Sequence, residues 1–368
     1  MAEPLKNSFG PDVVERIADA LAAQLASFAR DRFVAAALDG FDELELTGRA
    51  RHVAAAMAEH LPTDRAEALR IVTSSLGPED EELVGMEGFF YLPHVYFVAD
   101  YGLEHFDEAM TAQYELTKRF TAEFSIRAYL EQHEAATLAQ LREWTTDPSE
   151  HPRRLVSEGT RPRLPWAGRL KAFQADPAPV IELLELLKDD ESEYVRRSVA
   201  NNLNDIAKDH PELVVEIAGS WWADADDNRR RLIRHGLRTL IKAGDPGALE
   251  VLGYGPNSPL VISDVTLTPT DPMIGGKVRV ELTLANPTAA AVGGLIDLRV
   301  HFVKANGSTS PKVFKGAEVE VEPGGQAVVA KTVSLRQHST RTHYPGRHEL
   351  DVLVNGEVRP GASFELGE

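Results

Sequence analysis

Three acidic side chains stand among basic ones in the middle of the sequence. Glu123 follows a Lys-Arg-Phe triplet, Glu158 is the only acid in the segment 151–171, and Asp205 comes shortly after Arg197. A carboxylate fixed among cations can stabilise positive charge that develops on a substrate, and it can orient or deprotonate water. It can equally be a salt-bridge partner that steadies its arginine neighbours. For each of the three acids both interpretations stay open.

Helical spacing groups further residues with these acids. Asp205 follows Arg197 and Asn201 at two successive four-residue steps, so the three share one helix face. Arg127 follows Glu123 by about one helical turn. If the face that carries Asp205 is turned toward a ligand, its carboxylate points at that ligand.

Trp166 ends the segment 161–166, Arg-Pro-Arg-Leu-Pro-Trp, whose prolines predict a loop or the start of a helix. An indole flanked by arginines suits stacking on a base or sugar, and it suits a cation–π contact with a positively charged base. The alternative is a tryptophan packed at the rim between two helical repeats. Trp221, by contrast, falls on the apolar side of a predicted helix, and we expect it in the core.

Several common chemistries have no signature in the sequence. The chain has no cysteine, which excludes disulfides and thiolate metal sites. It contains no P-loop, no GxGxxG after a strand, no HExxH and no GxSxG. The 12 histidines are scattered, and none lies four residues from another on a plausible helix. We therefore expect neither a metal site nor a cofactor.

The formal charge of -18 is unevenly distributed along the chain. Residues 1–116 contain 8 Lys/Arg and 22 Asp/Glu, a net charge of -14. Two segments are basic instead: 151–171 has 6 basic residues and 1 acidic residue, and 228–242 has 6 basic and none acidic. A basic strip on an acidic body attracts a polyanion to one face. The alternative is that both runs are ordinary solvated helix faces.

From residue 10 to about residue 254 the apolar pattern has a helical period. Val14, Ile17, Leu21 and Leu25 form one stripe, and similar stretches follow at 47–60, 63–75, 104–120, 123–142, 178–188, 194–208, 212–222 and 228–242. A shift of 34 residues lays Val180 on Val214, Leu187 on Trp221 and Leu203 on Leu237. This period predicts an all-α solenoid of HEAT-like helix pairs, whose second helices would line a concave surface with the basic runs on it.

After residue 255 the period changes to two. Seven strands are predicted, at 260–268, 278–285, 295–304, 312–321, 327–336, 347–354 and 358–366. Turn signals such as Asn306-Gly307 and Asn355-Gly356 separate them. Seven short strands over about 110 residues fit an all-β immunoglobulin-like sandwich without its disulfide. We therefore predict a multidomain chain, with a helical domain at 1–255 and a sandwich at 258–368.

No apolar run approaches the roughly 18 residues that a membrane span needs, so we expect no membrane contact. The first residues lack the apolar region and the cleavage site of a signal peptide. With no cysteine in the chain, a cytoplasmic protein is the simple expectation. A concave ligand surface needs no second copy, so we also expect a monomer.

Three segments resemble the AlkC family of bacterial DNA alkylation repair glycosylases, which are HEAT-like repeat proteins related to AlkD. They are EFSIR at 123–127, RRLVSEGTRPRLPW at 153–166 and VRRSVANNLNDIAKDHP at 195–211. The resemblance covers roughly residues 8–255. Some family members carry a C-terminal immunoglobulin-like domain, which residues 258–368 fit, and RTHYPGRHELDVLVN at 341–355 is similar to part of it.

The resemblance implies hydrolysis of the N-glycosidic bond of cationic bases such as 3-methyladenine and 3-methylcytosine in double-stranded DNA, without flipping of the base. Carried over by motif, Glu123, Asp205 and Trp166 match the active-site carboxylates and tryptophan of the family, and Glu158 matches with a less defined role. Loop residues such as Arg341 and His343 are expected to add a backbone contact from the sandwich. The full set of expected DNA contacts is Arg127, Arg154, Arg161, Arg163, Arg169, Arg197, Asn201, Arg230, Arg231, Arg234, Arg238 and Arg341.

These residue types suit that reaction. A base alkylated at N3 is a cation and leaves as a neutral molecule, so it needs no strong general acid. Positive charge builds on the deoxyribose instead, where carboxylates can stabilise it. The rival interpretation is a helical-repeat scaffold that binds DNA or a protein partner and has no catalytic activity, because most solenoids are scaffolds. The acids Glu123 and Asp205 favour the enzyme, since a pure phosphate clamp would avoid them.

Overall fold

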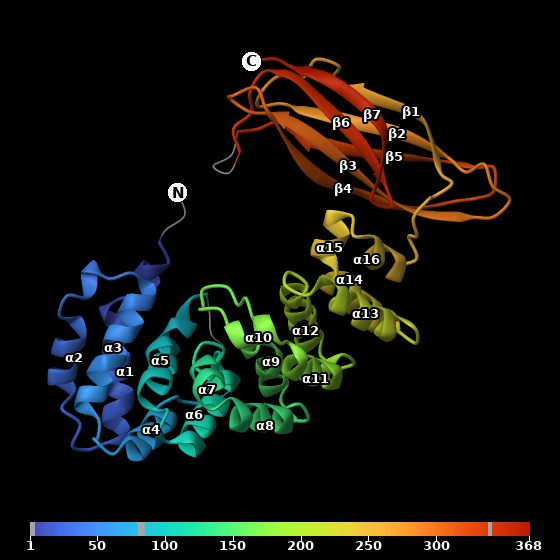
Figure 1. The fold of residues 1–368 in the computed structure, drawn as a ribbon. Helices are drawn as coiled ribbons and strands as arrows, with labels where there is room; N and C mark the ends of the chain where they lie inside the picture. Colours follow the sequence, from blue (N-terminus) through green and yellow to red (C-terminus); the bar gives the residue numbers. More distant parts are fainter. Residues whose placement is uncertain (1–3, 80–84, 338–340) are drawn as a thin grey trace. The chain divides into compact units, whose positions relative to one another are not determined.

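The computed structural model describes residues 4–79, 85–337 and 341–368 (Figure 1). The chain forms two compact units, Met1–Asp209 and His210–Glu368. Across the described residues, no helix combines the length and the apolar character that crossing a membrane requires.

The first unit is built from helices. They are α1 (Pro11–Gln24), α2 (Arg30–Leu38), α3 (Leu46–His60), α4 (Arg65–Ser74), α5 (Leu92–Tyr101), α6 (Phe106–Arg119), α7 (Ile126–Gln132), α8 (Glu134–Trp144), α9 (Glu150–Gly159), α10 (Lys171–Ala175), α11 (Ala178–Leu187) and α12 (Glu193–Ile206), with 3-10 turns at Leu5–Ser8, Phe41–Glu43 and Glu87–Tyr91. Val14, Ile17 and Leu21 of α1 are fully buried, as their spacing predicts.

The predicted helices of this unit differ from the structure in two ways: one predicted stretch is two helices, and α2, α5, α9 and α10 were not predicted. The stretch 123–142 is not one helix, because the chain breaks at His133 between α7 and α8. Helix α5 had no amphipathic signal, because Leu92–Ala99 are buried on every side of the helix. A helix that is apolar all round shows no stripe to detect.

The second unit begins with four more helices, α13 (Pro211–Trp222), α14 (Asp227–Gly236), α15 (Arg238–Ala243) and α16 (Pro246–Val251). The 34-residue shift pairs buried positions with buried positions, including Leu187 with Trp221 and Leu203 with Leu237. The predicted core position of Trp221 is therefore confirmed, at 3% exposure. The two basic runs lie in different units, so their predicted location on one concave face stays a prediction.

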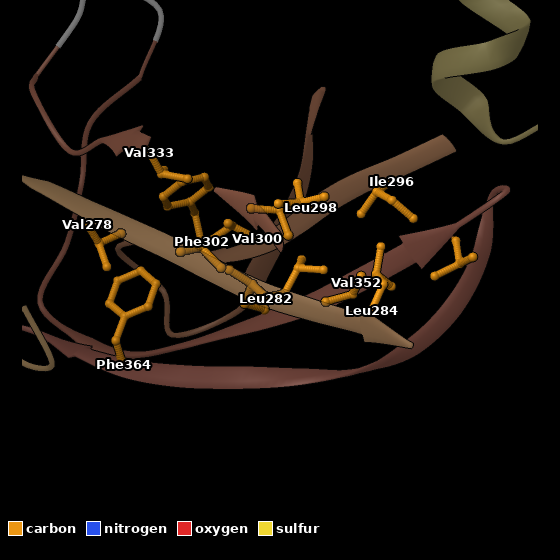
Figure 2. Close-up of a cluster of buried hydrophobic side chains, with 14 of the residues drawn as sticks. Val278, Leu282, Leu284, Ile296, Leu298, Val300, Phe302, Val333, Val352 and Phe364 are labelled. Carbon is orange, nitrogen blue, oxygen red and sulfur yellow. The ribbon is translucent and has the colours of Figure 1, made fainter. Parts of the chain in front are cut away.

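Seven strands complete the second unit and confirm the predicted all-β region. They are β1 (Val261–Thr268), β2 (Lys277–Ala285), β3 (Val292–Val303), β4 (Thr309–Val321), β5 (Gln326–Ser334), β6 (Gly346–Val354) and β7 (Glu357–Leu366). The strands form two antiparallel sheets, in the orders β1-β2-β5 and β4-β3-β6-β7. Apolar side chains from both sheets meet between them, among them Leu282, Leu298, Val352 and Phe364 (Figure 2). Alternation of buried and more exposed residues, clearest along β2, directs these side chains into the core.

Close contacts join the helical part and the strands of the second unit. Asn355 donates from Nδ2 to the carbonyl of Gly255 at 3.0 Å. Gly244 and Gly356 both have positive φ, of 76° and 78°, and a Cβ at Gly356 would lie 3.0 Å from the Cα of Gly244. Glycine is needed at this contact for its backbone conformation and for its small size.

Candidate active site

Acidic and basic side chains alternate in one continuous chain of contacts within the first unit. Arg154 Nη1 donates to Glu123 Oε2 at 2.7 Å, and Arg154 Nη2 lies 3.6 Å from Glu158 Oε1. Arg161 Nη1 donates to the same Glu158 oxygen at 2.6 Å, and Arg161 Nε donates to Asp205 Oδ2 at 2.8 Å. The three acids that the sequence places among cations are thus joined into a single network, in the order Glu123, Arg154, Glu158, Arg161, Asp205.

Two packed helices carry the two most buried carboxylates of the network. Glu158 lies on α9 and Asp205 on α12, which pack against each other (Figure 1). Ser198 of α12 donates to Glu158 Oε2 at 2.6 Å. Asn202, one turn further along α12, donates to the carbonyl of Ser157 at 2.8 Å and to Thr160 Oγ1 at 3.1 Å. These bonds fix the register between the two helices, and with it the alignment of the two carboxylates.

Glu123 occupies the open end of the network. It lies in the turn between α6 and α7, where its backbone N–H donates to Thr121 Oγ1 at 3.1 Å. The Thr121 hydroxyl in turn donates to Glu123 Oε2 at 3.0 Å. The side chain of Glu123 is 15% exposed, and within the described part of the chain its Oε1 accepts no hydrogen bond. That oxygen is available to a ligand.

Asp205 occupies the opposite, buried end of the network. It is 1% exposed, and its second oxygen, Oδ1, accepts a bond from Lys208 Nζ at 2.8 Å. The side chain of Lys208 is 38% exposed. The ammonium of Lys208 therefore lies between the buried carboxylate of Asp205 and the solvent.

The network neutralises most of its own charge. Three carboxylates face the two guanidinium groups of Arg154 and Arg161 and the ammonium of Lys208. Burial lowers the pKa of Arg154 and of Arg161. The nearby carboxylates raise it by more, Glu158 and Glu123 for Arg154 and Glu158 and Asp205 for Arg161, so both pKa values lie above the usual value for arginine. The guanidinium groups therefore stay charged, and they hold the carboxylates in place as charge-assisted partners.

The segment between α9 and α10 presents Trp166 to solvent. Trp166 is 81% exposed, and its φ of 64° lies in the left-handed region that non-glycine residues rarely adopt. Arg163 anchors the segment through two bonds to Asp209, at 2.9 and 2.6 Å. The alternative interpretation, in which Trp166 packs at the rim between two repeats, is therefore wrong. The indole is exposed to solvent and accessible to a ligand.

Arg127 and Arg161 do not fit their predicted role as phosphate contacts. Arg127 is 5% exposed and donates to three backbone carbonyls, of which Arg161 O lies 2.7 Å from Nη1. Arg161 is 8% exposed and is held between Glu158 and Asp205. Both guanidinium groups point inward because the carbonyls and carboxylates of the site surround them.

The network lies within the part of the chain that matches the family described as "DNA alkylation repair enzyme", residues 119–239. Residues 261–368 match a second family, "Uncharacterised protein YhaZ, C-terminal Ig-like domain". A solved structure, Pseudomonas fluorescens alkylpurine DNA glycosylase AlkC bound to DNA containing an abasic site analog, is similar over 100% of both chains, with 36% identity and a TM-score of 0.88. The chain belongs to the AlkC family.

A second relative spans the same length. The Bacillus subtilis (strain 168) protein named "Uncharacterized protein YhaZ" is 34% identical over 363 residues, which are 98% of this chain and 99% of that protein. The resemblance to AlkC proteins with a C-terminal immunoglobulin-like domain is thereby confirmed, together with the predicted fold class of helical repeats followed by a sandwich.

The other predicted DNA contacts of this AlkC family member differ in accessibility. Arg169, Arg197, Arg230 and Arg231 are exposed, whereas Arg154, Arg163, Asn201, Arg234, Arg238 and Arg341 are half-buried. Arg234 is paired with Glu318, and Arg238 donates to the carbonyl of His235 at 2.5 Å. Arg341 lies over the ring of Phe302, 4.9 Å from its centroid.

His343, the second loop residue expected at the DNA backbone, is 3% exposed and packs edge-on against Phe302. Its ring is thus buried in the sandwich, in contact with Phe302. The prediction that this side chain contacts a phosphate is therefore wrong.

Four residues of the site, Ser198, Asn202, Lys208 and Tyr194, were not predicted from the sequence. Ser198, Asn202 and Asp205 are buried polar residues at i, i+4 and i+7 on α12, a polar stripe on the side of the helix that faces α9. That spacing was a detectable signal. Lys208 follows Asp205 by three residues, which also suggests a pair. Tyr194, whose ring lies 5.2 Å from the Arg154 guanidinium, had no such signal.

The site is made of carboxylates, guanidinium groups and aromatic rings. Within the described residues, no three or more His, Asp or Glu side chains are arranged to hold a metal ion. The chemistry that the arrangement can perform is electrostatic stabilisation of positive charge and activation of water by a carboxylate.

Proposed function

We propose that this chain is a monofunctional DNA glycosylase that hydrolyses the N-glycosidic bond of cationic N3-alkylated bases in double-stranded DNA, with 3-methyladenine and 3-methylcytosine as the expected lesions. The observation that carries the proposal is the network from Glu123 to Asp205, which lies inside the match to a DNA alkylation repair enzyme. The AlkC relative, which is 36% identical over its whole length, is an alkylpurine DNA glycosylase bound to an abasic site analog.

The catalytic roles follow from the accessibility of the carboxylates. A cationic base leaves as a neutral molecule, and the deoxyribose becomes oxocarbenium-like. Glu123 offers an oxygen that no described residue occupies, so we assign it to the water molecule or to the sugar. Asp205 adds negative charge once Lys208 moves aside, and the buried Glu158 orients Arg154 and Arg161. A base at this step contributes roughly 10²–10⁴-fold to the rate.

Trp166 supports excision without base flipping. Its indole is 81% exposed at the tip of an anchored segment, so it would meet the lesion at the surface of the protein. A cation over the face of an indole is favoured by about 0.5–2 kcal/mol over a neutral base. Stacking would therefore hold the charged lesion while the carboxylates act on its sugar.

The exposed arginines of both basic runs supply the expected phosphate contacts. Arg230 and Arg231 lie on α14, Arg169 follows Trp166 by three residues, and Arg197, outside the two runs, lies on α12 beside Ser198 in the sequence. Because each neutralised phosphate releases counterions, affinity should fall steeply with salt. Arg230→Ala should lower the salt slope by about one unit if that residue meets a phosphate. A flat salt titration of the unsubstituted protein would argue against this surface.

The deciding experiment incubates the protein with methylated double-stranded DNA and measures released free base by chromatography. Glu123→Gln and Asp205→Asn should lose excision by roughly 10²–10⁴-fold and still bind lesion DNA. Glu134→Gln, which changes an exposed glutamate at the start of α8, is the matched control and should keep full activity. Binding without any release of base would instead support a non-catalytic scaffold, and full activity in both site variants would refute the mechanism.

A further inference from the structure

Arg127 is a buried cation without a carboxylate partner. Its side chain lies in α7 and is 5% exposed, and among the residues that the structure describes it forms no ion pair. Burial lowers its pKa to about 10. A buried guanidinium is unfavourable unless its N–H groups are satisfied. Here backbone carbonyls satisfy them, and the position of those carbonyls along the chain indicates what the arginine does.

The three carbonyls belong to the segment that leads from the carboxylate network to Trp166. Nη1 donates to Gly159 O at 3.2 Å and to Arg161 O at 2.7 Å, and Nη2 donates to Gly168 O. Gly159 is the last residue of α9, and Gly168 comes two residues after Trp166. One planar side chain therefore binds both ends of the segment that carries the indole.

The packing around Arg127 leaves it little freedom. A Cβ at Gly159 would lie 2.5 Å from Ile126 Cγ2, so the start of α7 fits directly against the end of α9. At the other end of the segment, a Cβ at Gly168 would meet nothing within 4 Å. The Cβ side of Gly168 is thus open while its carbonyl is bound by Arg127, and glycine itself restricts the backbone little.

We propose that Arg127 is a positioning residue: through its three carbonyl bonds it fixes the segment 159–168 and thereby the orientation of Trp166 toward the lesion. This inference rests on the proposed glycosylase function. It also replaces the phosphate contact expected from the sequence, because a guanidinium that is 5% exposed and donates inward has no face for DNA.

Arg127→Lys is the informative substitution. It keeps the charge but removes the planar fork that reaches carbonyls on both ends of the segment. Misplacement of a reacting group by about 1 Å can slow a reaction roughly 10²-fold, so single-turnover excision should fall roughly 10- to 100-fold. Affinity for undamaged DNA and its salt slope should stay within twofold. Arg142→Lys, at an exposed arginine of α8 paired with Glu182, is the matched control and should change neither quantity.

A double-mutant cycle tests whether Arg127 acts through Trp166. Excision is compared in the unsubstituted protein, Arg127→Lys, Trp166→Ala and the combination. If the arginine serves the indole, Arg127→Lys slows the Trp166→Ala protein less than threefold. An equal loss in both backgrounds, or a salt slope lowered by about one unit, would overturn the proposal.

A second measurement does not depend on activity. The chain has 4 tryptophans, so incorporation of 5-fluorotryptophan gives a small set of ¹⁹F resonances, and Trp166→Phe identifies the one from Trp166. Arg127→Lys should shift or broaden that resonance and leave the others unchanged, and Arg127→Gln serves as the second variant if the lysine protein folds poorly. An unchanged Trp166 resonance, or an equal change in all of them, refutes the positioning role. Loss of excision by the unsubstituted protein would instead refute the proposed function and leave this measurement intact.

Discussion

Removal of the charge of Glu158 should weaken the fold more than removal of the charge of Glu123, although both belong to one network. Glu158 is the branch point: its two oxygens accept bonds from Arg161 and Ser198 at 2.6 Å each, and Arg154 lies 3.6 Å away. Its side chain is 7% exposed, against 15% for Glu123, which has one arginine partner. Glu158→Gln leaves two nearby guanidinium groups with one carboxylate each.

The size of the effect follows from those contacts. Breaking a buried ion pair by removal of one partner costs about 3–5 kcal/mol, because a charge is left uncompensated. In Glu158→Gln the amide can still accept a bond, and Arg154 and Arg161 keep Glu123 and Asp205. We therefore expect a loss near or slightly below the lower limit, about 2–3 kcal/mol of unfolding free energy. Glu123→Gln, at the open end, should lose about 1 kcal/mol or less.

Urea unfolding followed by the helical circular dichroism signal measures this difference. The urea concentration at the midpoint should fall clearly for Glu158→Gln and little for Glu123→Gln. The slope of the unfolding free energy against urea concentration should be the same for both variants. Glu134→Gln is again the surface control. Equal midpoints for Glu158→Gln and the control would show that the network does not stabilise the first unit, and the argument from its buried geometry would fail.

Three further outcomes are expected. Burial lowers the pKa of His94 to about 4 from an ordinary value of 6.5, so below pH 6.5 the folded state binds fewer protons than the unfolded state. The free energy of unfolding should therefore fall by roughly 3 kcal/mol in all as the pH drops from about 6.5 to about 4. Urea unfolding at pH 7 and pH 4.5 should show a smaller loss of stability in His94→Leu than in the unsubstituted protein. Gly356→Ala places a Cβ 2.8 Å from Leu249 Cδ1 at a φ of 78° and should destabilise the second unit by about 2–3 kcal/mol, whereas Gly253→Ala, at a φ of 84° with nothing within 4 Å, should lose only about 1 kcal/mol in the same assay. Lys208→Met removes the exposed cover of Asp205 and, under the proposed function, should keep single-turnover excision within about threefold, because Arg161 still holds the carboxylate.

The sequence alone predicted the sandwich well, and physical reasons explain that success. Strand β2 and the first half of β6 alternate between a buried and a more exposed face, and glycine and asparagine mark the turns, so local residues carry the signal. The repeat was visible for a similar reason, because Val180 and Val214 fill equivalent buried positions 34 residues apart. Helix α5, buried on every side, offered no alternation to detect.

The direction of charged side chains could not be predicted in the same way. Arg127 and Arg169 are both arginines near the site, yet one is buried under three carbonyls and the other is exposed. A local sequence contains no information about which distant backbone will come within reach of a guanidinium group. Trp166 was placed correctly in a loop by its prolines, but only the structure distinguishes a packed indole from an exposed one.

The charge balance of the network bears on how a cationic lesion would be selected. Arg154, Arg161 and Lys208 neutralise the three carboxylates, so little net negative charge remains to attract a cation before reaction. Apart from stacking on Trp166, binding should therefore differ little between a cationic lesion and an ordinary base. Charge that develops on the sugar meets the open oxygen of Glu123 only as the bond breaks, and interactions that strengthen in the transition state raise the rate and not the affinity. Under the proposed function, the preference for cationic bases should accordingly appear mainly in the single-turnover rate, and the dissociation constant should differ only by the contribution of stacking on Trp166.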